Sequence, residues 1–295
     1  MSLASLLPYD HAYAGGYPGI GSQPLPTDAD ALDYLSRMAT ADGAGVETGV
    51  AVAVDAFVRD AKELGVFSSL KACCILAGAR TLAGALVPVV GDAPTNVANG
   101  FVSGDYTRGG ATPGLKGDGT SYLDSGRAGT DDSQNDSHIS VYVSTPAGSS
   151  NRTLISNEYT WIAEDDTTTY FRVNASSSVT VAKHNVTGFI GASRPSSTNV
   201  NLRIDALSTS PASASRSPGA SIEVFRNWNA TQYSDATLAF YSIGTSLSLE
   251  DLDTAVTNLI ARLKFALLTG ENPAPYDIDT VTYVVRGYEN GGTLQ

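Results

Sequence analysis

Two glutamates in the segment EYTWIAEDD, residues 158–166, come closest in this sequence to a catalytic pair. A retaining glycosidase needs two carboxyl groups about 5–5.5 Å apart, which a β-strand supplies when both project from one face. Glu158 and Glu164 share strand parity, but Thr160 and Ile162 occupy the positions between them. We therefore interpret Glu164 and the aspartates after it as a solvated turn and expect no catalysis. The alternative to this non-catalytic interpretation is that the protein is a polysaccharide-degrading enzyme.

Aspartates recur around the polar loop that follows residue 117, and hard oxygen ligands gathered on loops are what calcium requires. The candidate ligands are Asp118, Asp124, Asp131 and Asp132, with Asp136 nearby. Their spacing fits no EF-hand pattern, and solvated acidic loops have the same composition. Calcium is therefore a hypothesis, and we expect no other cofactor.

The histidines and cysteines do not form a catalytic or metal-binding pattern. His11, His138 and His184 have no ligand spacing between them, and we expect His138 to hydrogen-bond loop backbone. Cys73 and Cys74 are adjacent, so on a strand they point to opposite faces, and we expect two reduced buried thiols.

Sugar binding would use aromatic rings with amide and hydroxyl groups beside them. The candidates are Trp161 on a central strand and Arg226, Asn227 and Trp228 at a strand end. Packing in the core or at the rim is the other interpretation of both tryptophans.

A strictly alternating strand must position these loops. Ile139, Val141 and Val143 share one face of the segment SHISVYVST, residues 137–145, with serines and Tyr142 on the other. This pattern predicts a half-buried strand of an antiparallel sheet, and its β-branched face needs a second layer to cover it. Short alternating runs separated by turn clusters continue to residue 243, which favours a sandwich or jelly roll.

Three segments carry a resemblance to a known family. YLDSG followed by SHISVYVST, then GFIGASR at 188–194, then LAFYSIG at 238–244 with LSLE after it, occur in this order. Together they resemble the concanavalin A-like (laminin G-like) jelly-roll domains of tailed-bacteriophage structural proteins, over roughly residues 67–270. The resemblance implies a mainly β, antiparallel jelly-roll sandwich in a virion protein, and it says more about architecture than activity.

Helices are expected on both sides of the sandwich in sequence. Residues 28–66 predict a helical hairpin, with an N-cap at 27–30 and an apolar stripe that includes Val54 and Phe57. Ser248 is expected to cap a helix over Leu249–Leu268, whose stripe includes Leu252, Val256, Ile260 and Leu263.

The two ends of the chain lack a core of their own. Residues 1–27 hold four prolines and the spaced tyrosines Tyr9, Tyr13 and Tyr17, which predicts an extended arm docked on another subunit. Residues 271–295 form a tail in which Tyr283 lies on an alternating run, as in a strand added to another chain's sheet. We therefore assign assembly to these four tyrosines.

Composition limits the partners. A net charge of −12 argues against a nucleic-acid or anionic-membrane partner. Residues 72–90 are apolar, but Arg80 lies among them, so we expect a buried strand and helix and no membrane insertion. Residues 1–21 have no basic segment, so we expect no signal peptide and synthesis in the host cytoplasm.

Together these features predict a non-enzymatic structural protein on a tailed-phage virion surface, in a tail fibre or spike or as a capsid decoration protein. Its expected partners are copies of itself, other virion proteins and a host surface glycan, which it would use for host attachment.

Overall fold

A computed structural model describes residues 26–97, 100–148, 152–182 and 186–268 of the chain. The arm at 1–25 and the tail at 269–295, with Tyr9, Tyr13, Tyr17 and Tyr283, lie outside the described residues. Within them, no helix has the length and apolarity to cross a membrane.

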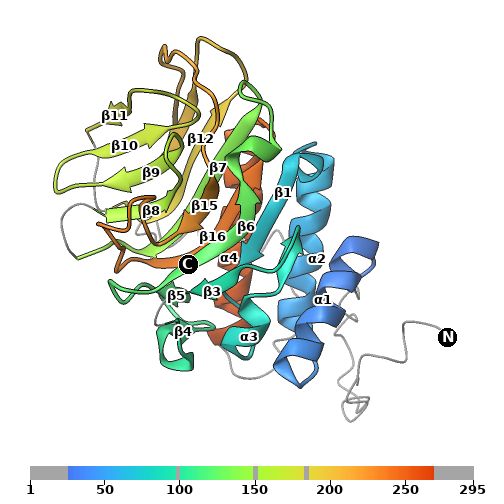
Figure 1. Cartoon of the computed structure of the whole chain (residues 1–295). Helices are drawn as coiled ribbons and strands as arrows, with labels where there is room; N and C mark the ends of the chain where they lie inside the picture. Colours follow the sequence, from blue (N-terminus) through green and yellow to red (C-terminus); the bar gives the residue numbers. More distant parts are fainter. Residues whose placement is uncertain (1–25, 98–99, 149–151, 183–185, 269–295) are drawn as a thin grey trace, which may run out of the picture.

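The protein is an antiparallel β-sandwich with helices on one side (Figure 1). Sheet A holds nine of the described strands, in the order β14-β13-β12-β7-β16-β1-β2, with β5 paired to β16 and β4 to β5. Sheet B holds seven, in the order β11-β10-β9-β8-β15-β6-β3. Every paired strand runs antiparallel to its neighbour, which confirms the predicted mainly β fold class.

The strands of sheet A are β1 (Leu70–Ile75), β2 (Pro88–Val90), β4 (Tyr106–Thr107), β5 (Gly114–Lys116), β7 (Ser137–Thr145), β12 (Gly188–Arg194), β13 (Asn201–Ile204), β14 (Leu207–Thr209) and β16 (Thr237–Gly244). Those of sheet B are β3 (Thr95–Val97), β6 (Tyr122–Ala128), β8 (Arg152–Ser156), β9 (Trp161–Glu164), β10 (Thr169–Arg172), β11 (Val179–Val181) and β15 (Ser221–Val224). The segments that carry the family resemblance include β12, β7 and β16, which are neighbours at the centre of sheet A.

The helices are α1 (Ala29–Asp42), α2 (Thr48–Glu63), the short α3 (Leu82–Ala85) and α4 (Leu249–Leu268). Asp28 caps α1 by accepting from the amides of Asp30 and Ala31, and Gly43 ends it at φ 66°. The Oγ of Ser248 accepts from the amide of Asp251 at 3.3 Å, as the sequence predicts for the start of α4.

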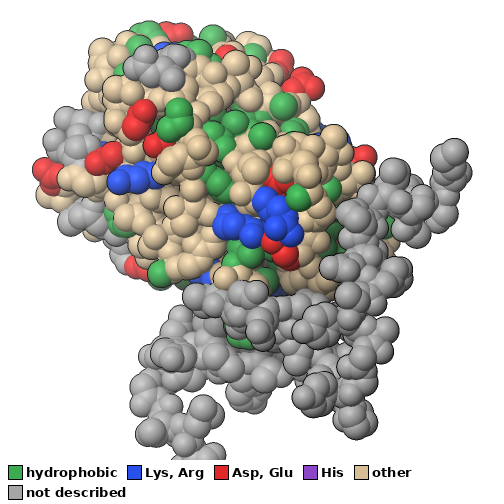
Figure 2. All heavy atoms as spheres, turned by 90° about the horizontal axis from the view of Figure 1, so that it is seen from below, with side chains coloured by type: hydrophobic (Ala, Val, Ile, Leu, Met, Phe, Trp, Pro, Cys, Tyr) green, Lys and Arg blue, Asp and Glu red, His purple; other side chains and the backbone are tan. Residues whose placement is uncertain are grey.

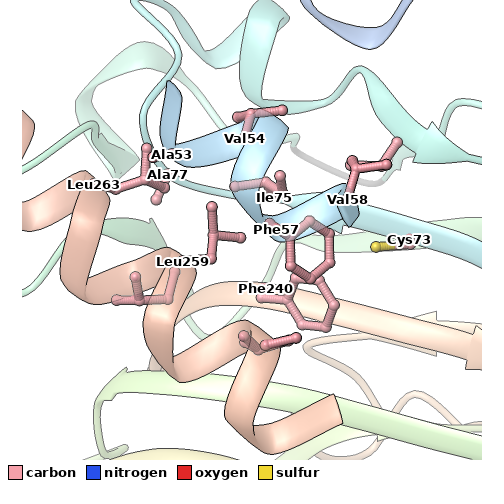
Figure 3. Packing of buried hydrophobic residues seen from close by; sticks show 14 of the residues in the cluster. Ala53, Val54, Phe57, Val58, Cys73, Ile75, Ala77, Phe240, Leu259 and Leu263 are labelled. Atoms are coloured by element: carbon pink, nitrogen blue, oxygen red, sulfur yellow. The ribbon is translucent and has the colours of Figure 1, made fainter. Parts of the chain in front are cut away.

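Helices α1, α2 and α4 cover the face of sheet A that points away from sheet B (Figure 1). Their apolar stripes share one core with Cys73, Ile75 and Phe240 of the sheet. Phe57 of α2 meets Phe240 edge to face with ring centroids 5.9 Å apart, and Leu259 and Leu263 of α4 pack beside them (Figure 3). The hairpin therefore packs on its own sandwich.

A second core fills the space between the two sheets. Ile139, Val141 and Val143 of β7 lie in it with Cys74, whereas Cys73 lies in the helix-side core. The two thiols thus point to opposite faces, are both free, and are both buried, as predicted. Burial raises the pKa of Cys74 to about 12, so this thiol is not a nucleophile at neutral pH.

The half-buried strand predicted at β7 is wrong in one respect, because both of its faces are buried. The serine face lies beneath the helical layer, where His138, Ser140 and Ser242 are each 0% exposed. Small polar side chains can lie there because they bond one another: Ser140 Oγ is 2.7 Å from Ser242 Oγ, and Ser242 Oγ is 3.0 Å from His138 Nε2. A 3-10 turn at Ser103–Asp105 lies between β3 and β4.

Candidate functional site: the outer face of sheet B

The outer face of sheet B carries aromatic and arginine side chains near the surface. Along β9 and β10 the buried residues Ile162 and Phe171 point into the core, so their neighbours Trp161 and Arg172 point outward. The turn between the strands pairs Arg172 with Trp161 directly across the ladder. The guanidinium carbon of Arg172 lies 3.7 Å from the centre of the Trp161 ring.

A second arginine–aromatic pair adjoins the first. Arg216 lies over the ring of Tyr159, 3.7 Å from its centre, and donates to the tyrosine hydroxyl at 2.8 Å. The chain around Arg216 is held beside the end of β10 by its own amide, which donates to the carbonyl of Asn174 at 2.6 Å. We call the four side chains Tyr159, Trp161, Arg172 and Arg216 the Trp161 patch.

The electrostatics of the Trp161 patch follow from its contacts. Burial and then the positive charge of Arg216 lower the pKa of Arg172. Tyr159 donates its hydroxyl proton to Glu158, and this hydrogen bond raises the pKa of Tyr159. Trp161 Nε1 and Arg172 Nε are buried nitrogens without an acceptor among the described residues.

The other predicted sugar-binding residues lie elsewhere on sheet B. Arg226 follows β15, packs 3.5 Å from the centre of the Tyr122 ring, and forms an ion pair with Glu223. In the sheet order β9-β8-β15, one strand separates Trp161 from Glu223. The structure therefore places Arg226 on the same face as Trp161 but not in the same patch.

Asn227 and Trp228 occupy the turn beyond Arg226. The side-chain oxygen of Asn227 accepts from the amides of Thr231 and Gln232, both at 2.9 Å, so this side chain shapes the turn. Trp228 is 50% exposed, which makes it one of the most exposed large apolar side chains described. It is available to a ligand at the turn, away from the Trp161 patch.

The two glutamates of the enzyme alternative point in different directions. Glu158 lies in the turn before β9. The prediction that Glu164 belongs to a solvated turn is wrong, because Glu164 ends β9 with its side chain inward and 1% exposed. Burial raises the pKa of Glu164, and the positive charge of Arg152 lowers it in part. The pair thus lacks the shared strand face that the glycosidase geometry requires.

The four aspartates of the calcium hypothesis each have their own local role. Asp118 accepts from the amides of Thr120 and Ser121, Asp124 from that of Gly126, Asp131 from that of Ala128, and Asp132 pairs with Arg127 at 2.5 Å. Burial raises the pKa of Asp118, but these hydrogen bonds outweigh it and hold that pKa below its ordinary value. In the described ranges, no three Asp, Glu, His or Cys side chains gather as metal ligands. The calcium hypothesis thus has no shared ligand set.

His138 is structural, as predicted. Its Nδ1 lies 2.6 Å from the carbonyl oxygen of Thr245, and since a carbonyl only accepts, Nδ1 carries the proton. Ser242 then donates to Nε2. Burial lowers the pKa of His138 to about 4, so the ring is neutral at physiological pH.

Three solved structures are similar to part of this chain. Domain 4 of AbnA, a GH43 extracellular arabinanase from Geobacillus stearothermophilus, in complex with arabinotriose, is 14% identical, and the match covers 46% of this chain and 72% of that chain with a TM-score of 0.34. The structure of HCR/D-Sa-GBL1/C is 12% identical, and the match covers 47% of this chain and 40% of that chain with a TM-score of 0.32. The binding domain of botulinum neurotoxin DC in complex with SialylT is 10% identical, and the match covers 47% of this chain and 39% of that chain with a TM-score of 0.33. No family model matches the sequence, and no curated protein matches it significantly.

Proposed function

We propose that the protein is a non-catalytic structural protein of a tailed-phage virion whose β-sandwich binds a glycan through the outer face of sheet B. One observation carries the binding proposal: the two outer faces of the sandwich differ. That of sheet A is buried under α1, α2 and α4, whereas that of sheet B presents Trp161, Arg172 and Tyr159 near the surface.

The side chains of the Trp161 patch suit a sugar. Aromatic rings pack against the apolar C–H faces of pyranoses, and the guanidinium groups of Arg172 and Arg216 lie beside the rings as hydrogen-bond donors. Strands β9 and β10 hold Trp161 and Arg172 in fixed register, as binding sites require. The helical side of the sandwich would then be the side turned toward the rest of the particle.

The virion context rests on the resemblance carried by residues 122–126, 137–145, 188–194 and 238–250. A tail fibre or spike would use the glycan for host attachment, and a capsid decoration protein would not need it. Immunogold labelling of intact particles with an antibody to the purified protein distinguishes the two locations. Absence of label from particles would remove the virion proposal and leave the binding proposal untouched.

A glycan array probed with the purified protein tests the binding proposal. We expect a defined set of glycans to be bound, and we expect Trp161→Ala to lose that binding because the ring is the centre of the patch. Leu64→Ala is the matched control, since Leu64 lies 39% exposed just after α2, on the helical side. Equal binding by wild type and Trp161→Ala would place the site elsewhere.

Reducing-sugar release separates a binding protein from an enzyme. The buried Glu164 has a raised pKa, a property shared with general-acid carboxyls. We expect no release from the glycans bound on the array. Release that disappears in Glu164→Gln would establish the enzyme and overturn this proposal.

A further inference from the structure

The arginines of the Trp161 patch differ from most other cations of the protein. Those with a carboxylate partner at ion-pair distance are Arg37, Arg59, Arg80, Arg108, Arg127, Arg152, Arg203, Arg226 and Arg262. Figure 2, the view from below, shows basic side chains with acidic ones beside them. Within the ranges that the structure describes, neither Arg172 nor Arg216 has such a partner.

Burial alone does not explain why Arg172 and Arg216 lack a carboxylate partner in the described part of the chain. Arg194 also lacks a carboxylate in the described part of the chain, but it is buried and its guanidinium donates to the carbonyls of Val173, Ser196 and Ser213, so it holds a loop in place. Among the described residues Arg172 bonds no comparable set of carbonyls, and its guanidinium lies over the face of the Trp161 ring. Stacking fixes the plane of its guanidinium and leaves the edge N–H groups for another acceptor.

The two guanidinium groups reinforce one another as an anion site. Arg216 stacks on Tyr159, two residues before Trp161, and its amide bonds the carbonyl of Asn174, two residues after Arg172, so the two guanidinium groups lie on neighbouring parts of the patch. After burial, the charge of Arg216 is the next cause that lowers the pKa of Arg172. The chain as a whole carries −12, which repels anions at long range. At 0.1 M salt this repulsion is screened beyond about 10 Å, so a local pair of cations decides whether an anion binds.

We propose that the Trp161 patch binds an acidic sugar, with the oxyanion of the sugar held by Arg172 and Arg216 and its ring packed against Trp161 and Tyr159. This inference rests on the proposed glycan binding and names its substrate class. The oxyanion is a carboxylate or a sulfate, since a guanidinium binds either one through two parallel N–H donors. Arg172 also has a buried Nε–H, and Trp161 a buried indole N–H, without an acceptor among the described residues.

Glu158 opposes the anion and offers a sensitive control. Tyr159 donates its hydroxyl proton to Glu158, and Arg216 donates to the same hydroxyl. The Tyr159 hydroxyl thus links the negative charge of Glu158 to the positive charge of Arg216. Replacing this carboxylate with an amide keeps a hydrogen-bond acceptor and removes the charge. Glu158→Gln should therefore tighten binding of an acidic sugar and leave that of a neutral one unchanged.

Isothermal titration of the full chain with three sets of hexasaccharides tests the inference: polygalacturonate for carboxylate, a sulfated galactan for sulfate, and unmodified galactan as the neutral probe. We expect at least one acidic hexasaccharide to bind, with affinity falling between 50 and 300 mM NaCl, and galactan to bind at least about tenfold more weakly. Arg172→Gln should lose at least about tenfold in affinity for the acidic probe, and Arg172→Lys should lose less because it keeps the charge.

Arg37→Gln is the matched control, because it removes a surface arginine from α1 on the helical side. Thermal melts show whether each variant is folded. If Arg172→Gln does not fold, the loss of affinity is measured with Arg172→Lys. Equal affinity for galactan and the acidic probes, or equal losses in Arg172→Gln and Arg37→Gln, would overturn the inference and leave glycan binding standing. If the glycan array and all three probes show no binding, both proposals fail.

Discussion

At the scale of single residues, burial decides the chemistry of this protein more than residue type does. His138 is a titratable ring, yet it lies under the helical layer with Nδ1 bonded to Thr245 and Nε2 to Ser242. Glu164 is a carboxylate, yet it points into the sandwich. Neither is available to solvent, and both therefore affect stability as a function of pH.

His138 should make the protein less stable below about pH 6.5. Burial lowers its pKa from 6.5 to about 4, so below 6.5 the unfolded chain binds a proton that the folded chain does not. The associated stability is present above pH 6.5 and is lost as pH falls toward 4, up to about 3 kcal/mol at 1.36 kcal/mol for each pKa unit. Urea unfolding at pH 7 and pH 4.5 measures it.

His138→Asn gives the matched comparison, since the amide can still donate to the Thr245 carbonyl but does not titrate in this range. We expect its free energy of unfolding to fall less between the two pH values than that of the wild type. Both proteins contain the same carboxyl groups, such as Glu164, so the contribution of these groups cancels when the two falls in free energy are compared. An identical fall in both proteins would show that His138 is not neutral in the folded state.

The sequence pattern singled out one residue of the proposed patch and none of its neighbours. Trp161 was among the predicted sugar-binding residues, but Arg172, Tyr159 and Arg216 were not. Arg172 could have been found, because the turn at residues 165–168 pairs 164 with 169 and hence 161 with 172. Arg216 could not, since its place depends on a contact between residues 174 and 216 that no local pattern encodes.

At the scale of elements, strong periodicity predicted well and short segments did not. The strand β7, the strand β16 and the helix α4 each have many residues in one repeating pattern. The three-residue strands β2, β3, β5 and β14 have too few positions to show alternation, and the sequence did not predict them. The serine face of β7 was wrongly predicted to be exposed, because buried serines that bond one another have the same sequence pattern as exposed ones.

Helix α4 ties the helical layer to sheet A, so a charge on its buried face should destabilise the whole protein. Ile260 is 0% exposed and lies in the helix-side core. Loss of its packing costs about 2–5 kcal/mol, and burying an unpaired carboxylate adds to that. Ile260→Asp should therefore lower the melting temperature sharply, as measured by circular dichroism.

The control for Ile260→Asp is Asn258→Asp, two residues away on the exposed face of α4. It adds the same charge to the same helix without burying it, and we expect little change in melting temperature. If Ile260→Asp also melts at the wild-type temperature, α4 does not pack on the sandwich as described.

At the scale of the whole molecule, the sandwich is asymmetric. One sheet, sheet A, is covered by helices from both ends of the described chain, and none of these three helices lies on the outer face of sheet B (Figure 1). The hairpin lies apart from the sandwich in sequence, but its side chains share the core that contains Phe240 and Leu259. Removing it would expose that core.

Truncations distinguish the hairpin from the arm. Deleting residues 1–25 leaves Thr27 and Asp28, whose amides both donate to Asp55 at 2.8 Å, so we expect an unchanged melting temperature. Deleting residues 1–66 removes α1 and α2 with their apolar stripes, and we expect aggregation or loss of a cooperative transition. A stable, monomeric protein lacking 1–66 would show that the hairpin is dispensable for the fold.

The arm deletion also tests assembly. If Tyr9, Tyr13 and Tyr17 dock on another subunit, the protein lacking 1–25 should fold and yet fail to join particles during infection. Normal incorporation would pass the attachment role to the hairpin or to the tail that contains Tyr283.

The central claim is that the outer face of sheet B is the binding surface, and tryptophan fluorescence tests it most directly. The sequence holds two tryptophans, Trp161 in the patch and Trp228 in the distant turn, so Trp228→Phe and Trp161→Phe each leave a single reporter. Titration of a glycan selected on the array should shift the emission of Trp161 in Trp228→Phe to saturation, at the concentration where calorimetry finds binding. A saturable change seen only from Trp228, or from neither tryptophan, would contradict the account.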